Sequence, residues 1–239
     1  MEFLDPLIRG TLIKRYKRFL TDVELETGEI VIAHCANPGS MLSLLVEGAE
    51  VWLSPARNPD RKLKYTWEMI RIGEAFVGLN THFANKIVEE AIENGQIPEL
   101  AGYETLRREV KYGKNSRIDI LLEGDGVPMC YVEIKSVTMS RPEKCERANK
   151  LAEFPDSVTA RGTKHLQELS DQVQGGKRAV MFYLVQRADC DEFAIAGDID
   201  PTYAAALKAA KSAGVEALCY GCTVSPDTIK ITRKLNFAR

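Results

Sequence analysis

Three residues in the second half of the chain have types and spacing suited to phosphodiester chemistry. Asp119 lies in the segment RIDILL, and Glu133 and Lys135 lie in the segment CYVEIK. Two carboxylates can hold a hard divalent cation such as Mg²⁺ or Mn²⁺ and leave room for phosphate oxygens of a substrate. A lysine beside them could orient the attacking water and stabilise developing charge on the phosphate. The three residues therefore predict a metal-dependent nuclease site, with Asp119 and Glu133 as metal ligands and Lys135 as a catalytic group.

A hairpin must bring these residues together. The two segments flank residues 123–128, whose sequence EGDGVP is rich in turn formers, so they are predicted to pair as antiparallel strands. A register centred on this turn places Ile120 opposite Val132 on an apolar face. It also places Asp119 opposite Glu133 on the other face, with their Cβ atoms roughly 5 Å apart. Facing carboxylates repel unless they share a proton or a cation, which favours a bound ion. The alternative is a surface ladder in which neighbouring basic residues neutralise the two acids.

A helix predicted over residues 160–173 would supply positive charge. Its polar stripe, separate from its apolar stripe, has the spacing i, i+3, i+4, i+7 and contains Arg161, Lys164, His165 and Glu168. If this stripe faces the acidic pair, Arg161, Lys164 and His165 can position the phosphates of a nucleic acid. If it faces solvent, it has no such role.

The N-terminal part is predicted to be a small OB-like β-barrel. Short strands are expected at residues 18–25, 30–34, 49–54 and 63–72, separated by turn signals. The segment KRYKRF interleaves basic and aromatic residues, as in barrels that bind single strands by stacking and backbone charge. We therefore predict a nucleic-acid contact at Lys14, Arg15, Lys17 and Arg18. The alternative is that the aromatic residues belong to the core and the basic ones to a solvated surface.

The pattern changes near residue 80. Residues 84–94 form an amphipathic helical pattern, and farther on strands at 179–185 and 216–220 alternate with helices at 160–173 and 201–213. This alternation indicates an α/β domain with a mixed sheet. We predict two separately folding domains, an OB-like barrel over residues 1–82 and an α/β domain over residues 83–239.

The composition limits the possible partners. With a net charge of −2 the protein cannot coat polyanions by bulk attraction, so a nucleic-acid site must be local. The longest apolar run, residues 179–185, is too short to cross a bilayer, and no membrane partner is expected. Without a secretory signal, the six cysteines predict reduced thiols and a cytoplasmic protein. Cys219 and Cys222 have C-x-x-C spacing but no second ligand pair for zinc, so they are predicted to be buried thiols.

Longer stretches of the chain carry a family resemblance. They are LIKRYKRFL, AHCANPGSM, EVKYGKNSRIDILLE, YVEIKSVTM, EFPDSVTARGTKHLQEL and KRAVMFYLVQR. The sequence resembles the sugar fermentation stimulation protein A (SfsA) family from end to end. The resemblance implies an N-terminal OB-type domain, a C-terminal domain similar to the PD-(D/E)xK nucleases, and DNA binding linked to the regulation of sugar (maltose-type) utilisation.

Within the nuclease pattern, the resemblance assigns roles to individual residues. The two acidic ligands map to Asp119 and Glu133 and the lysine to Lys135, while Ile118 stands where the pattern has proline. Many members of that superfamily take another acidic ligand from an early helix, for which Glu90 is the candidate. The implied cofactor is Mg²⁺ or Mn²⁺.

Two functions remain open on these grounds. One is a metal-dependent nuclease whose barrel grips DNA while the C-terminal domain cuts it. The other is a non-catalytic DNA-binding transcriptional regulator that retains the nuclease-like scaffold. DNA is the expected partner in both, and the pattern does not determine the oligomeric state.

Overall fold

The computed structural model describes residues 1–113, 116–141 and 151–238. Cys145, one of the six predicted thiols, lies outside the described residues, and the other five cysteines are buried. The strands of the N-terminal part are β1 (Ile8–Tyr16), β2 (Leu20–Leu25), β3 (Ile30–Cys35), β4 (Glu50–Pro55), β5 (Tyr65–Ile72) and β6 (Ala75–Gly78).

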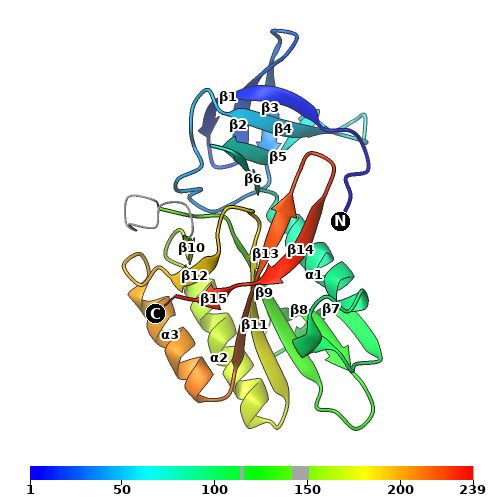
Figure 1. Ribbon diagram of the computed structural model, residues 1–239, viewed down its shortest axis with the longest axis vertical. Helices are drawn as coiled ribbons and strands as arrows, with labels where there is room; N and C mark the ends of the chain where they lie inside the picture. Colours follow the sequence, from blue (N-terminus) through cyan, green and yellow to red (C-terminus); the bar gives the residue numbers. More distant parts are fainter. Residues whose placement is uncertain (114–115, 142–150, 239) are drawn as a thin grey trace.

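These strands form a closed barrel (Figure 1). They run in the order β3-β2-β1-β4-β5-β6, and parallel pairing of β3 with β5 closes the ring. Buried and more exposed residues alternate along β2 and β3, which turns Val23, Ala33 and Cys35 inward. The fully buried Trp67 of β5 fills the interior, and the second tryptophan, Trp52, lies on β4. The prediction of an OB-like barrel is confirmed.

The basic cluster lies differently in this barrel from the prediction. β1 and β6 were not predicted, and the strand expected from residue 18 begins at Leu20. Lys17 and Arg18 have positive φ angles of 49° and 63° and form the turn between β1 and β2. The cluster therefore spans a strand end and a turn, because the backbone bends within it.

The C-terminal part contains nine further strands and three α-helices among the described residues. They are, with two short 3₁₀ helices, η1 (Thr81–Phe83), α1 (Ala84–Glu93), η2 (Pro98–Leu100), β7 (Thr105–Tyr112), β8 (Ser116–Glu123), β9 (Cys130–Val137), β10 (Leu151–Phe154), α2 (Ala160–Gln174), β11 (Arg178–Val185), β12 (Glu192–Ile195), α3 (Pro201–Ser212), β13 (Glu216–Val224), β14 (Ile229–Lys234) and β15 (Asn236–Phe237).

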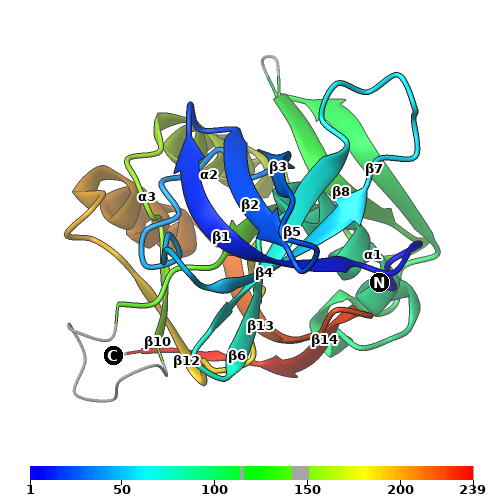
Figure 2. The same ribbon diagram turned by 90° about the horizontal axis from the view of Figure 1, so that it is seen from above.

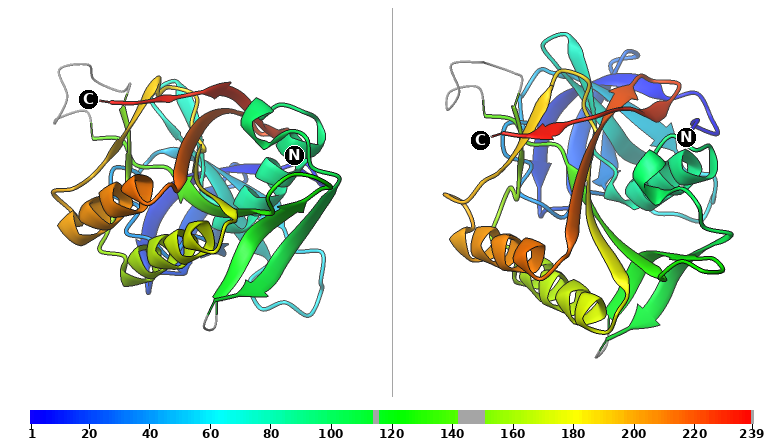
Figure 3. Two further views of the ribbon diagram at one scale, coloured as in Figure 1. Left: turned by 90° about the horizontal axis from the view of Figure 1, so that it is seen from below. Right: turned by 60° about the horizontal axis from the view of Figure 1, so that its bottom comes forward.

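A mixed sheet forms the centre of this part, as predicted. Its order is β14-β13-β11-β9-β8-β7, with β11 parallel to both β9 and β13 and antiparallel pairs toward both edges. A second, small parallel sheet has the order β10-β12-β15. Helices α2 and α3 cover one face of the main sheet and α1 covers the other (Figure 3).

Strand β11 explains the long apolar run in the sequence. It lies between β9 and β13 with helices on both faces, and its residues from Ala179 to Val185 are all buried. Phe182 and Leu184 pack toward α1, whereas Met181 and Tyr183 pack toward α2 and α3. A strand buried on both faces needs apolar residues at every position rather than at alternate ones.

The barrel is packed directly against the sheet domain. The backbone N–H of Gly78 donates to the carbonyl of Gln186 at 2.8 Å, and Val77 bridges to Arg187. Met1 and Leu7 belong to the apolar core around α1, so the first residues of the chain contact the sheet domain rather than the barrel interior. Figure 2 shows the N-terminus beside α1. In the described part of the chain, the helices are too short or too polar to span a membrane.

Candidate functional site

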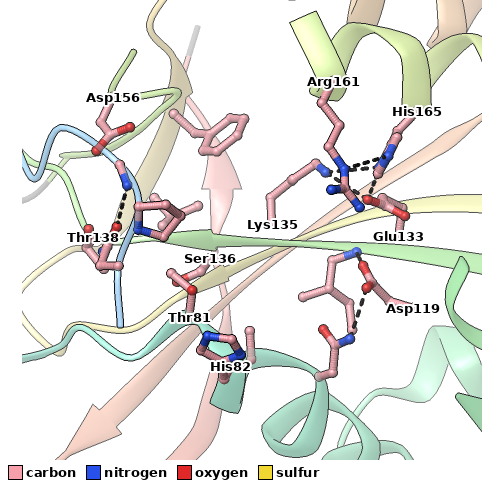
Figure 4. Close-up of a pocket in the computed structure, with 18 of the residues that line it drawn as sticks. Thr81, His82, Asp119, Glu133, Lys135, Ser136, Thr138, Asp156, Arg161 and His165 are labelled. Atoms are coloured by element: carbon pink, nitrogen blue, oxygen red, sulfur yellow. Dashed lines mark hydrogen bonds and ion pairs between the residues drawn. The ribbon is translucent and has the colours of Figure 1, made fainter. Parts of the chain in front are cut away.

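A cavity of about 600 Å³ opens between the barrel and the sheet domain (Figure 4). The sheet domain contributes Asp119 from β8, Glu133 and Lys135 from β9, and Arg161 and His165 from α2. The other wall comes from a barrel loop at residues 37–39 and from Thr81 and His82 between the two parts. The structure thus brings together five residues that the sequence proposed for the site.

Asp119 lies where β8 and β9 separate. The predicted register holds, since Ile120 pairs with Val132, and Asp119 comes directly after the last pair. Its Oδ2 accepts a hydrogen bond from the backbone N–H of Ile134 at 2.7 Å, and its Oδ1 accepts one from Asn85 at 2.9 Å. Burial and the neighbouring charge of Glu133 nevertheless raise the pKa of Asp119 to about 6. The carboxylates therefore repel, as the register predicted, and a positive charge between them would favour the ionised form.

Glu133 is almost completely buried, and only one of its two carboxylate oxygens has partners among the described residues. Its side chain is 3 % exposed, and its Oε1 accepts from Lys135 at 2.8 Å and contacts Nδ1 of His165. Burial opposes ionisation, but Lys135 and His165 outweigh it, so the pKa of Glu133 lies below its ordinary value. Oε2 is buried and accepts no hydrogen bond within the described residues. An ionised oxygen without a donor is costly unless a ligand supplies a partner.

The imidazole of His165, on α2, contacts both Arg161 and Glu133. Nε of Arg161 donates to Nε2 of His165 at 3.3 Å, which leaves Nδ1 to carry the proton that faces Glu133. Lys164 turns away: its Nζ lies 3.3 Å from Ser116 and 3.5 Å from Glu168, and it does not line the cavity.

The polar stripe predicted for this helix is therefore divided. His165 and Glu168 are buried, so the stripe is not a uniform face toward solvent or ligand. The side chain of Arg161 reaches the cavity along with His165, because the loop before α2 sets the start of the helix beside β9. The structure places Arg161 and His165 in the cavity and Lys164 outside it.

Glu90 is not part of the cavity. Its carboxylate lies 2.6 Å from the N-terminal ammonium of Met1 and 3.8 Å from Lys86. From α1 the cavity is lined by Ala84 and by Asn85, whose amide donates to Asp119. The apolar face of α1, which includes Ile87 and Val88, fixes the helix so that its first turn points at the site and Glu90 points elsewhere.

The basic cluster of the barrel has a structural role in part. Arg15 donates to the backbone carbonyls of Asn37 and Gly39 at 2.8 and 3.0 Å, and Arg18 donates to that of Pro38 at 3.1 Å. These bonds hold the loop that walls the cavity. Lys14 forms an ion pair with Asp22 at 3.7 Å, and Lys17 is exposed at the turn. The two arginines of the cluster therefore support the loop, and the two lysines remain the candidates for a nucleic-acid contact.

The same loop is fastened to the sheet domain through Asp156. The carboxylate of Asp156 accepts from the backbone N–H of Met41 at 2.9 Å, and its carbonyl accepts from Ser40 at 2.7 Å. A Cβ atom on Gly39 would lie 2.6 Å from Oδ2 of Asp156. A side chain at residue 39 would therefore displace the Asp156 carboxylate that accepts from Met41.

Replacing Gly39 by alanine is expected to destabilise the protein by about 1–3 kcal/mol, the usual cost of overpacking, and to move the loop away from the cavity. Gly175→Ala is the matched control, because its Cβ would meet its nearest neighbour at 3.4 Å. Thermal unfolding of the two variants checks this. Equal stability of Gly39→Ala and the parent would show that the loop can shift without cost.

Sequence reasoning missed the residues that surround the acidic pair. Asn85, His82 and the barrel loop carry no periodic signal, since each lies at the end of an element or in a loop, and Glu109 lies in the middle of β7, where the strand pattern alone does not mark it as a cavity residue. Asn80 carries a local signal, because asparagine is a common N-cap residue: its side chain accepts from the backbone N–H of His82 at the start of the 3₁₀ helix that leads into the site.

Comparison with known sequences agrees with the two-part structure. The model described as "SfsA N-terminal OB domain" matches residues 13–79, and the model described as "Sugar fermentation stimulation protein RE domain" matches residues 82–228. The chain belongs to the SfsA family. A sugar fermentation stimulation protein homolog of Paramagnetospirillum magneticum is 56 % identical, with 97 % of this chain and 95 % of that protein aligned. One from Rhodospirillum rubrum is 57 % identical, with 95 % and 94 % aligned.

A solved SfsA structure has the same fold. The structure of Pyrococcus furiosus SfsA in complex with Ca²⁺ matches with a TM-score of 0.87 and 26 % identity, covering 100 % of this chain and 98 % of that chain. The barrel, the mixed sheet and their relative placement are therefore shared within the SfsA family.

A hard divalent cation fits the donor set of this SfsA chain. Oε2 of Glu133 is a buried oxygen without a hydrogen-bond donor. The neighbouring carboxylate of Asp119 has further lone pairs that can coordinate a cation. In the described residues no three His, Cys, Asp or Glu side chains form a group that could hold a metal ion. Mg²⁺ is commonly bound by one or two carboxylates, and water and phosphate oxygens fill its remaining coordination positions.

Proposed function

We propose that this SfsA-family protein is a divalent-metal-dependent nuclease that binds DNA with its barrel and cleaves it at the Asp119, Glu133 and Lys135 site. The observation that carries the proposal is the buried, unpartnered Oε2 of Glu133 beside Asp119 in a cavity of about 600 Å³. The solved relative from Pyrococcus furiosus is in complex with Ca²⁺, which supports a divalent-ion site in this chain as well.

Asp119 and Glu133 would hold the ion, for which we propose Mg²⁺ or Mn²⁺. When bound, such an ion supplies Lewis-acid polarisation of a phosphate and lowers the pKa of water. The backbone N–H of Ile134 and the amide of Asn85 keep the Asp119 carboxylate in place. His165 and Lys135 share Oε1 of Glu133, which leaves Oε2 for the ion.

Lys135 and Arg161 supply positive charge without being ligands. The side chain of Lys135 is 15 % exposed and borders the cavity, so a phosphate that enters can accept from its ammonium group. Arg161 donates to His165 with Nε, and its remaining guanidinium donors are suited to a phosphate oxygen. These two groups would orient the scissile phosphate and stabilise its charge in the transition state.

The barrel supports a DNA-binding role through its lysines. Replacing Lys14 and Lys17 together by alanine is expected to weaken DNA binding and to reduce the slope of log K against log salt by about 1 for each phosphate that is no longer neutralised. Lys208→Ala on the exposed side of α3 is the control. Binding isotherms at several salt concentrations measure both, and an unchanged slope would place the DNA elsewhere.

The deciding experiment is incubation of the purified protein with single- and double-stranded DNA in Mn²⁺ and in chelator. We expect cleavage with Mn²⁺ alone. If the parent binds Mn²⁺ and DNA but cuts neither form, the second function holds: a metal-assisted DNA-binding regulator. A link to sugar utilisation is suggested for this chain by the names of its relatives, and either activity is compatible with it.

A further inference from the structure

The outer surface of the barrel carries a pair of parallel aromatic rings. The side chain of Phe19, directly before β2, is 44 % exposed, and the ring of His34, near the end of β3, lies beside it. The ring centroids are 6.4 Å apart and the ring planes differ by 12°, as in offset stacking. Neither ring belongs to the apolar core of the barrel. The pair therefore presents a flat aromatic surface that core packing does not explain.

The backbone holds Phe19 in this position. Its N–H donates to the carbonyl of Lys17 at 2.8 Å, and its carbonyl accepts from the N–H of Cys35 at 2.8 Å. The next residue, Leu20, pairs with His34 across the β2–β3 ladder. The two rings are therefore placed side by side before any ligand arrives, which lowers the entropic cost of binding.

Both rings lie next to groups that border the cavity of the candidate site. Arg18, the neighbour of Phe19, donates to the carbonyl of Pro38, which lines the cavity. Burial and neighbouring basic groups that include His82 lower the pKa of His34, so its ring is uncharged at neutral pH. His82 itself lines the cavity (Figure 4). A ligand that lies across the two rings can therefore continue into the cavity.

The charges near the rings favour an anionic ligand. Arg15 and Arg18 donate to backbone carbonyls, and neither they nor the exposed Lys17 forms an ion pair with an acid in the described part of the chain. The opposite end of the β2–β3 hairpin instead carries exposed acids, Glu24, Glu26 and Glu29. A polyanion is therefore attracted to the end of the hairpin at Phe19, beside the cavity, and repelled from the other end.

We infer that Phe19 and His34 form a base-stacking platform that binds unpaired nucleotides of single-stranded DNA and leads the strand into the cavity. The inference deepens the proposed function and rests on the DNA binding in it. In a duplex the faces of the bases are covered by their neighbours, so only an unpaired base can lie flat on the rings. Stacking accepts every base, because each has a π-face, and the basic groups beside the rings neutralise the phosphates. The substrate class is therefore a single strand, or a duplex with a single-stranded end, rather than an intact duplex.

Fluorescence anisotropy of the full chain in chelator tests the platform, because binding is then measured without cleavage. The probes are a labelled oligothymidylate of about 15 nucleotides, within the span of one OB barrel, and a blunt duplex of the same length. We expect the parent to bind the single strand more tightly than the duplex. Phe19→Ala should weaken single-strand binding by about 5–150-fold, the factor for one lost base stack, and leave duplex binding unchanged.

Two further variants separate stacking from other contacts. Phe19→Trp should keep single-strand affinity, and the oligothymidylate should quench the added indole emission beyond the change seen in the parent. Ile30→Ala is the matched control, because Ile30 is 65 % exposed on the outer face of β3 but lies at the acidic end of the hairpin. Its single-strand affinity should equal that of the parent.

Equal single-strand binding by Phe19→Ala and the parent would overturn the inference, as would an equal loss in Ile30→Ala. A parent that sediments as a dimer and dissociates on Phe19→Ala would also overturn it, since the rings would then form a protein interface. Cleavage in Mn²⁺ tests the nuclease separately. If the parent cleaves DNA while Phe19→Ala binds the single strand normally, the nuclease stands and the platform is wrong. If Phe19→Ala loses binding and the parent cuts no DNA, the platform stands without the nuclease.

Discussion

Replacing Glu133 by glutamine is expected to abolish the stabilisation of the protein by Mn²⁺ and, with it, DNA cleavage. Glutamine has nearly the same shape but cannot offer a charged oxygen at the position of Oε2. An ion present at 100 times its dissociation constant stabilises the folded state by about 2.7 kcal/mol, so the parent should gain a clear increment in melting temperature that the variant lacks. Thermal unfolding with Mn²⁺ and with chelator measures this, with Glu123→Gln as the control.

Lys135→Ala separates binding from catalysis. An ammonium is not a metal ligand, so Mn²⁺ should still raise the melting temperature of this variant. Cleavage should fall by about 10²–10³-fold, the effect of removing one group that stabilises transition-state charge. If Glu133→Gln keeps the full increment, the ion is bound elsewhere; if Lys135→Ala cleaves normally, the lysine serves only to balance Glu133.

Replacing Asp119 by asparagine is expected to stabilise the protein in chelator at neutral and higher pH. The pKa of Asp119 in the folded state is about 6, above the roughly 3.9 of an unfolded chain, so folding favours the protonated acid. Ionisation therefore costs stability: the cost is absent below pH 4, grows between pH 4 and 6, and is complete above pH 6. Two pKa units correspond to about 3 kcal/mol.

Glu133→Gln is expected, in contrast, to destabilise the protein in chelator at neutral pH. Lys135 and His165 lower the pKa of Glu133, so its ionised form contributes stability that is present at neutral pH and lost as the pH falls through its folded pKa. Chemical denaturation of both variants and the parent between pH 4 and 8 checks this contrast. A decrease in stability of Asp119→Asn at pH 8 would mean that its hydrogen bonds to Ile134 and Asn85 outweigh the repulsion.

Local patterns predicted the residues that carry the chemistry, since the hairpin register follows from alternation along two strands. Ile120 pairs with Val132 as expected, and the helix over residues 160–173 is α2. The remaining site residues depend on tertiary placement. Glu90 borders the apolar face of its helix, but only the packing of α1 decides that Asn85 meets Asp119 instead. Likewise, nothing in the periodicity of β7 shows that Glu109 lines the cavity.

The division of the chain into two parts was predicted from the change in sequence pattern, but the contacts between the parts were not. The change of pattern near residue 80 separated a barrel from a mixed sheet, but it did not reveal that Met1 and Leu7 pack against α1 or that Arg15 holds a loop over the site. Such contacts join segments far apart in the chain. The separate folding of residues 1–82 and 83–239 stays a prediction.

Spectroscopy can test whether the two parts fold separately, because the tryptophans and the α-helices lie in different parts. Trp52 and Trp67 are the two tryptophans of the chain and both lie in the barrel, whereas α1, α2 and α3 all lie beyond it. Indole fluorescence therefore follows melting of the barrel, and ellipticity at the helical wavelength follows melting of the sheet domain. Coincident denaturation curves from the two signals would identify one cooperative unit, and separated midpoints would identify two.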